Sequence, residues 1–122
     1  MKAGAVVTTE GAMLFARAER TEGLREKLRG LLGRDGLAID ESLWIDRCDS
    51  VHTLAMRFPI DLAYLDRAGE IRKTVEHLRP GRFSACFRAA ATLEMPAGSI
   101  GRLGLRRGDC VAFREHEEGG VA

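Results

Sequence analysis

Residues 60–78 read IDLAYLDRAGEIRKTVEHL, and this stretch predicts the β-hairpin around which the fold is organised. Residues 60–65 are apolar or aromatic except for Asp61 and are typical of a strand, and residues 70–78 are predicted to form a second strand. Between them, Asp66-Arg67-Ala68-Gly69 forms a short loop whose glycine is placed to take a positive φ. We therefore expect two neighbouring antiparallel strands here.

Further strands and turns lie on both sides of this hairpin. Strands are expected over residues 13–18, 43–48, 90–95 and 110–114. In the third of these, Leu93 and Met95 share one face, and Thr92 and Glu94 share the other. The first eleven residues are expected to form a frayed lead-in, and residues 115–122 a mobile tail.

Two helices are expected beside these strands. The longer one is predicted from an apolar stripe at helical spacing, Leu24, Leu28, Leu31 and Leu32, with Thr21 as its N-cap and Gly33 as its terminator. A short helix is expected to begin at Pro96-Ala97-Gly98 and to run to Leu103. Both helices should pack against the sheet.

The predicted fold class is α+β, with a mainly antiparallel, curled or barrel-like β-sheet and one long and one short helix packed on it. The 122 residues fit a single domain, 1–122, with an ordered core over about residues 12–114. With 19 basic and 18 acidic residues the net charge is +1, which argues against a dedicated nucleic-acid-binding protein.

The cysteines and the apolar segments indicate the cellular compartment in which the protein is expected. Cys48, Cys86 and Cys110 are odd in number and far apart, which fits neither a disulfide framework nor a zinc site. No apolar run approaches the roughly 18 residues of a membrane span. The apolar stretch near the N-terminus is also shorter than the core of a signal peptide. We expect a cytoplasmic protein without a membrane partner.

The densest group of chemically competent side chains follows the predicted strand 43–48. If residues 48–52 are extended, Cys48, Ser50 and His52 point to one face. A histidine beside a cysteine can activate its thiol, and Asp61 could orient that histidine. On a straight strand, however, Cys48 and His52 would lie about 13 Å apart. A structural thiol and a core histidine therefore remain the alternative.

Two other kinds of site are considered. Arg79, Arg82 and Arg88 lie near Pro80-Gly81, where regular secondary structure is expected to be interrupted. They could bind an anion, or they could simply be solvated. A metal site could use Cys48, His52, Met56 and His77, but no second His or Cys stands at ligand spacing from either histidine, so the fold alone would have to assemble it. The sequence contains no nucleotide-binding glycine fingerprint. We expect no metal and no cofactor.

Six motifs follow one another along the chain: Leu28-Arg29-Gly30-Leu31-Leu32-Gly33-Arg34, Cys48-Asp49-Ser50-Val51-His52-Thr53, Met56-Arg57-Phe58-Pro59-Ile60-Asp61, Tyr64-Leu65-Asp66-Arg67-Ala68-Gly69, Leu93-Glu94-Met95-Pro96-Ala97-Gly98 and Leu103-Gly104-Leu105-Arg106-Arg107-Gly108-Asp109. Together they resemble the DUF192 family of small uncharacterised bacterial and archaeal proteins. The resemblance spans about residues 13–114. It implies a compact β-rich α+β domain and no known activity, and its core signature covers residues 48–61.

Three functions remain open. The first is a non-catalytic ligand-binding or interaction module with a polar cleft around His52, which binds an unknown small molecule or protein. The second is an enzyme with Cys48 as nucleophile and His52 as base. The third is a structural partner in a larger assembly, and a homodimer through an exposed sheet edge is possible. The candidate cleft residues are Cys48, Ser50, His52, Thr53, Met56, Asp61 and Arg82.

Overall fold

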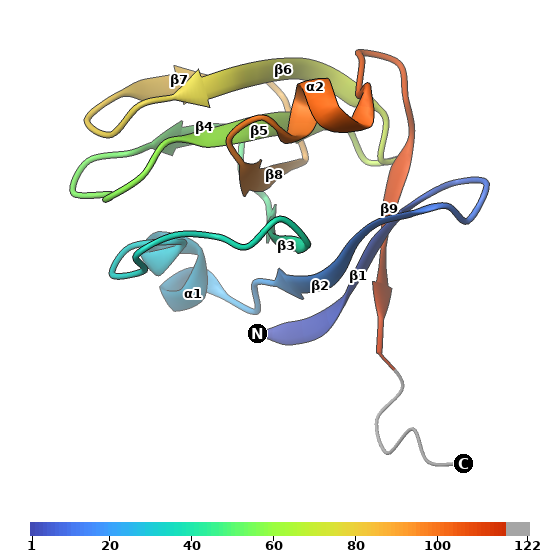
Figure 1. Ribbon diagram of the computed structural model, residues 1–122, viewed down its shortest axis with the longest axis horizontal. Helices are drawn as coiled ribbons and strands as arrows, with labels where there is room; N and C mark the ends of the chain where they lie inside the picture. The colour runs from blue at the N-terminus through green and yellow to red at the C-terminus, as the bar shows by residue number, and fades with distance from the viewer. Residues whose placement is uncertain (117–122) are drawn as a thin grey trace.

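The computed structural model describes residues 1–116, and most of these residues lie in or between β-strands (Figure 1). The elements are β1 (Lys2–Thr8), β2 (Met13–Arg20), α1 (Leu24–Arg29), β3 (Glu41–Asp46), β4 (Ser50–His52), β5 (Ile60–Leu65), β6 (Ile71–Leu78), β7 (Phe83–Ala85), β8 (Ala91–Pro96), α2 (Ser99–Leu103) and β9 (Val111–Glu115).

Seven strands form one mixed sheet in the order β6-β5-β8-β3-β2-β1-β9, and β4 pairs with β7 in a separate two-stranded sheet. Within the large sheet β2 and β3 run parallel, and the other neighbours run antiparallel. The hairpin predicted over residues 60–78 is confirmed, because β5 pairs with β6 from Ile60 opposite Leu78 to Leu65 opposite Ile71.

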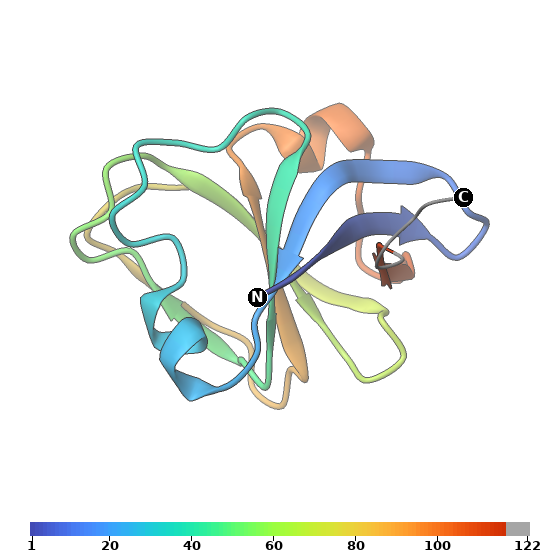
Figure 2. The same cartoon turned by 90° about the horizontal axis from the view of Figure 1, so that it is seen from below.

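The central strands of the sheet are buried on both faces. Every residue of β5 is buried, as are five consecutive residues of β8 and four of β3. A strand that is covered on both sides reads as a nearly continuous apolar run, which explains the sequence of residues 60–65. Figure 2 shows α1 and residues 30–40 on one side of these strands, and β1 and β2 on the other.

The predicted barrel-like closure is wrong, because the large sheet is open. Its edge strands β6 and β9 meet only at an isolated bridge between Glu70 and Cys110. Hydrogen bonds from Ile71 to Asp109 and from Val111 to Gly69 lie beside that bridge. The contact is therefore confined to the beginnings of the two strands, and no ladder joins the rest of them.

The predicted long helix is also wrong. Helix α1 has six residues and ends where Gly30 takes a positive φ of 48°, so Leu31 and Leu32 lie beyond it. Leu24 and Leu28 are each 68% exposed, whereas Leu31 is buried. The four leucines therefore do not form one buried stripe. Among the described residues no helix is long and apolar enough to span a membrane.

The predicted N-terminal lead-in is instead a strand inside the large sheet. β1 pairs with both β2 and β9, and Val6 is fully buried. Glu115, the first residue of the predicted mobile tail, belongs to β9, and the N–H of His116 donates to the carbonyl of Ala3. The remainder of that predicted tail, residues 117–122, lies outside the described residues.

Gly4 in β1 provides a test of this packing. A Cβ built on Gly4 would lie 2.3 Å from the carbonyl oxygen of Arg114 and 2.6 Å from the ring of Phe113. Because the backbone of β9 would have to move, we predict that Gly4→Ala lowers the free energy of unfolding by about 1–3 kcal/mol. Urea unfolding measures this, with Gly36→Ala as control, since a Cβ on Gly36 meets no atom within 4 Å. Equal stability of the two variants would contradict the register of β1 and β9.

Candidate functional site

A hollow of about 220 Å³ lies between α1 with its following turn and one face of the large sheet. We call it the α1 pocket. Its lining consists of Lys27, Leu28, Arg29, Gly30, Leu31, Leu32, Ile45, Cys48, Ser50, Val51, His52, Met56 and Glu94. The pocket therefore combines mostly apolar walls with a few polar groups, which is the usual composition of a small-molecule site.

Four of the seven predicted cleft residues line this pocket: Cys48, Ser50, His52 and Met56. Strand β4 places Ser50 and His52 on its exposed side at the rim, while Val51 between them is buried. Cys48 is 5% exposed, and its thiol donates to the carbonyl oxygen of Ser50 at 3.1 Å. No hydrogen bond joins Cys48 to His52 among residues 1–116.

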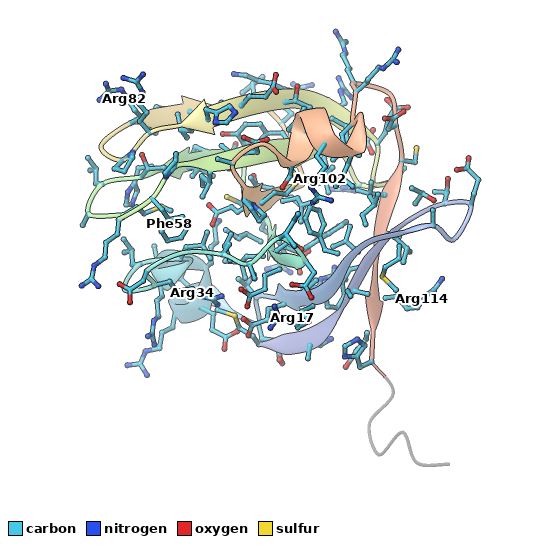
Figure 3. The ribbon with its side chains drawn as sticks, viewed as in Figure 1. Arg17, Arg34, Phe58, Arg82, Arg102 and Arg114 are labelled. Atoms are coloured by element: carbon cyan, nitrogen blue, oxygen red, sulfur yellow. The ribbon has the colours of Figure 1, made fainter. Side chains whose placement is uncertain are left out.

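Thr53, a predicted cleft residue, lies outside the lining of the pocket and holds a turn instead. Its side chain is fully buried, and its Oγ1 donates to the carbonyl of Arg79 at 2.6 Å and accepts from the N–H of Arg82 at 2.8 Å. The side chain of Arg82 is exposed beyond this turn, and it points away from Arg34 and α1 (Figure 3). Arg82 is likewise not part of the pocket lining.

Asp61 joins two elements rather than orienting His52. Its carboxylate is fully buried, with Oδ1 accepting from the N–H of His77 at 2.8 Å and Oδ2 accepting from the N–H of Ile100 at 2.9 Å. These bonds tie β5 to the end of β6 and to the beginning of α2. Because both oxygens accept hydrogen bonds from backbone N–H groups, we interpret Asp61 as a structural residue that connects β5 with β6 and α2.

The pocket lining also contains three charged residues that the sequence did not indicate as site residues, Lys27, Arg29 and Glu94, and of these three Glu94 is the buried one. On β8 it lies opposite Leu43 of β3 and opposite Leu62 of β5, so its side chain shares a face with two leucines. Glu94 is 4% exposed, and its Oε1 has no hydrogen-bond partner among the described residues. The alternation along residues 90–95 predicts that Glu94 lies on the other face of the strand from Leu93 and Met95. It does not show that both faces of β8 are covered.

Burial raises the pKa of Glu94 to about 7, because removing the carboxylate from water disfavours its charged form. The positive charge of Arg34 acts in the opposite direction. Arg34, however, pairs with Glu19 at 2.9 Å rather than with Glu94. The base of the pocket therefore holds an acid whose charge changes near neutral pH.

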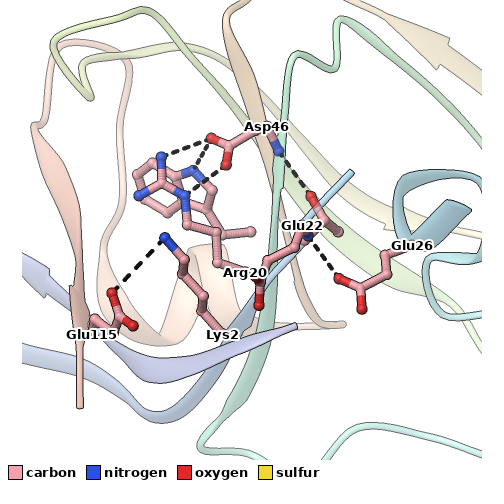
Figure 4. A network of polar contacts seen from close by, with 8 residues as sticks. Lys2, Arg20, Glu22, Glu26, Asp46 and Glu115 are labelled. Carbon is pink, nitrogen blue, oxygen red and sulfur yellow. Dashed lines mark hydrogen bonds and ion pairs between the residues drawn. The ribbon is translucent and has the colours of Figure 1, made fainter. Parts of the chain in front are cut away.

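A second, wider hollow of about 780 Å³ lies on the other side of α1, beside Trp44 and Arg47. In its wall Arg20 donates twice to the carboxylate of Asp46, at 2.7 and 2.9 Å, and Trp44 Nε1 donates to the same group (Figure 4). These polar groups are thus already paired with one another. Within residues 1–116 no group of three or more His, Cys, Asp or Glu side chains is placed to hold a metal.

The sequence matches the model of the DUF192 family, described as "Uncharacterized ACR", over residues 5–113. A solved structure from Sinorhizobium meliloti 1021, described as a candidate transcription regulator, aligns with a TM-score of 0.79 at 23% identity over 92% of each chain. A protein of unknown function from Novosphingobium aromaticivorans DSM 12444 aligns with a TM-score of 0.78 at 22% identity, over 90% of this chain and 83% of its own. None of the curated proteins matches. The two structures show a common fold.

The role of Asp61 can be tested by its removal. Asp61→Ala would leave the buried N–H of Ile100 and the partly buried N–H of His77 without an acceptor, so we predict a loss of about 3 kcal/mol in the free energy of unfolding. Asp35→Ala is the control, since Asp35 forms only an exposed ion pair with Arg57 and its loss should change stability by less than about 1 kcal/mol. Similar small effects for both variants would show that Asp61 does not hold β6 and α2.

Glu94 should make stability depend on pH. Its pKa in the folded protein, about 7, lies above the ordinary value of 4.5, so the folded state keeps a proton that the unfolded state loses. Stability should therefore fall as pH rises from about 4.5 to above 7, by about 3 kcal/mol in total. Glu94→Gln should remove this fall.

Urea unfolding between about pH 5 and pH 8.5 checks this expectation. Relative to the native protein, Glu94→Gln should gain stability towards high pH, while Glu76→Gln, at an exposed position of β6, should follow the native profile. Parallel profiles for Glu94→Gln and the native protein would show that the Glu94 carboxyl is not desolvated.

Proposed function

Since this chain belongs to the DUF192 family, whose description states no activity, we propose from the geometry that it is a non-catalytic module that binds a small molecule in the α1 pocket. The observation that carries the proposal is the convergence of Cys48, Ser50, His52 and Met56 with the unpartnered carboxyl of Glu94 on one hollow. A volume of about 220 Å³ suits a small molecule better than a peptide segment.

The arrangement of polar and apolar groups supports binding rather than nucleophilic catalysis. Cys48 is buried and donates to the Ser50 carbonyl, whereas a nucleophilic thiol needs an adjacent base or cation to activate it. His52 stands at the rim, where it can form a hydrogen bond with a ligand. Cys48 thus contributes a wall of the pocket, and His52 contributes to its specificity.

The position of Cys48 is itself fixed by the sheet. The hydroxyl of Thr92, fully buried on β8, donates to the carbonyl oxygen of Cys48 at 2.8 Å. Thr92 and Glu94 stand two residues apart on one strand, so they share a face. One face of β8 therefore supplies both the base of the pocket and the contact that holds its wall, as expected of a preformed site.

The proposal predicts where small molecules bind. In a screen of neutral and charged fragments by ¹H–¹⁵N NMR, we expect the largest shifts at Ile45, Val51 and Met56. His52→Asn should weaken the binding of the best fragment about 3- to 10-fold, the cost of one hydrogen bond. His77→Asn is the matched control, because His77 is exposed and lies outside the pocket lining. This variant should bind the fragment as tightly as the native protein does.

Two results would contradict this function. Fragments that shift no pocket residue would show that the hollow is not a binding site. Rapid alkylation of Cys48 that slows in His52→Asn, measured in a Cys86→Ser, Cys110→Ser background, would indicate an activated thiol and hence an enzyme.

A further inference from the structure

The acid at the base of the α1 pocket is in an unfavourable place for stability alone. Glu94 stands between Leu43 and Leu62 in the cross-strand row of β3, β8 and β5, on the face that the leucine-rich segment after α1 covers. A buried carboxylate without a hydrogen-bond partner destabilises a fold, and an apolar side chain in this row would not. The placement therefore points to a partner that comes from outside the chain.

None of the neighbouring cations supplies that partner. Arg34 is paired with Glu19, and the ammonium of Lys27 donates to the carbonyl of Arg47. Arg29 is exposed at the rim, where solvent and salt screen its charge. Among the described residues no ion pair to Glu94 lies within 4.0 Å.

The turn after α1 meets the carboxyl of Glu94 with a residue that has no side chain, Gly30. A Cβ on Gly30 would lie 3.9 Å from Glu94 Oε1, an ordinary van der Waals distance, so only backbone lies over the acid at this point. Helix α1 contains no buried residue and is flanked by Gly23 and Gly30, both with positive φ. The element that forms one wall of the pocket is thus held by few apolar contacts of its own.

We propose that the α1 pocket takes a small molecule with an apolar body and a protonated amine, and that the amine pairs with the carboxylate of Glu94 at its base. The inference rests on the proposed ligand-binding function. The apolar body would contact Leu31, Ile45, Val51 and Met56, which line the pocket around the acid. An ammonium donates to the unpartnered Oε1 and compensates the buried charge, whereas a neutral ligand leaves the charge uncompensated and an anion repels it.

Several charged and titratable groups around Glu94 must be considered when the effect of pH on ligand binding is interpreted. Lys27 and Arg29 line the pocket from α1, and Arg34 follows in the segment after this helix. Cys48 and His52 line the pocket from the segment around β4, and Tyr64 lies on β5 with its hydroxyl donating to Ser84 at 2.9 Å. Because His52 lines the same pocket as Glu94, the His52→Asn variant is measured in parallel.

The test uses three probes of one shape: isopentylamine, isopentyl alcohol and 4-methylpentanoate. Binding to the full chain is measured by NMR titration at about pH 8 and at about pH 5. At pH 8 we expect the amine to bind at least about 10-fold more tightly than the alcohol, and the carboxylate to bind most weakly. At pH 5 the preference for the amine should be smaller than at pH 8, because Glu94 is then protonated. The His52→Asn variant should show the same decrease from pH 8 to pH 5.

Two variants assign the preference to the carboxylate. Glu94→Gln should bind amine and alcohol within about 3-fold of each other, and Glu94→Asp should keep a reduced preference for the amine. Glu76→Gln, on the exposed side of β6, should behave as the native protein does. Amine and alcohol binding equally at pH 8, or an amine preference that survives in Glu94→Gln, would overturn the proposal.

The same titrations separate this inference from the function on which it rests. If the alcohol binds in the pocket as well as the amine does, the pocket still binds small molecules and only the assignment of the amine fails. If none of the three probes and no fragment of the screen shifts Ile45, Val51 or Met56, the proposed function fails with it.

Discussion

Burial of both faces of the central strands is the constraint on which the rest of this structure depends. β3, β5 and β8 lie side by side in the large sheet, with one apolar cluster around Trp44 and Leu93 and another around Leu43 and Leu62 on the opposite face. The central residues of these strands are buried whichever face their side chains occupy. Each polar side chain on them must therefore find its partner inside the protein, or remain without one at a considerable cost.

The polar residues of these strands meet that condition in different ways. Asp61 on β5 accepts two backbone N–H groups and joins β6 and α2, and Thr92 on β8 donates to the carbonyl of Cys48. Glu94, two residues from Thr92, has an oxygen without a partner and lies where the covering segment leaves a hollow. The same burial that makes Asp61 a structural residue makes Glu94 the chemical centre of the pocket, because Glu94, unlike Asp61, retains an acceptor without a partner among the described residues.

The element that covers this face is short because of one residue. Gly30 takes a positive φ and ends α1 after six residues, so the chain crosses the sheet as a turn and a loop rather than as a continuous amphipathic helix. Leu31 then packs into the core, while Leu24 and Leu28 stay exposed. The pocket exists because this covering is incomplete, and a helix packed along its whole length would have filled the space with leucine side chains.

The sequence by itself determined the hairpin of residues 60–78, the family resemblance and the segment around residues 48–56 that lines the pocket, because strand propensity, turn chemistry and local motifs are properties of neighbouring residues. The predicted long helix was wrong because the spacing of leucines does not show where a glycine changes the backbone. The barrel-like sheet and the N-terminal lead-in were wrong because local sequence does not show which strands pair at long range. Only the tertiary structure separated Thr53, Asp61 and Arg82 from the pocket and placed Glu94 in it. The physical reason is that whether a polar side chain faces water, a backbone N–H or an empty hollow depends on what packs against its strand, and that packing comes from distant parts of the chain.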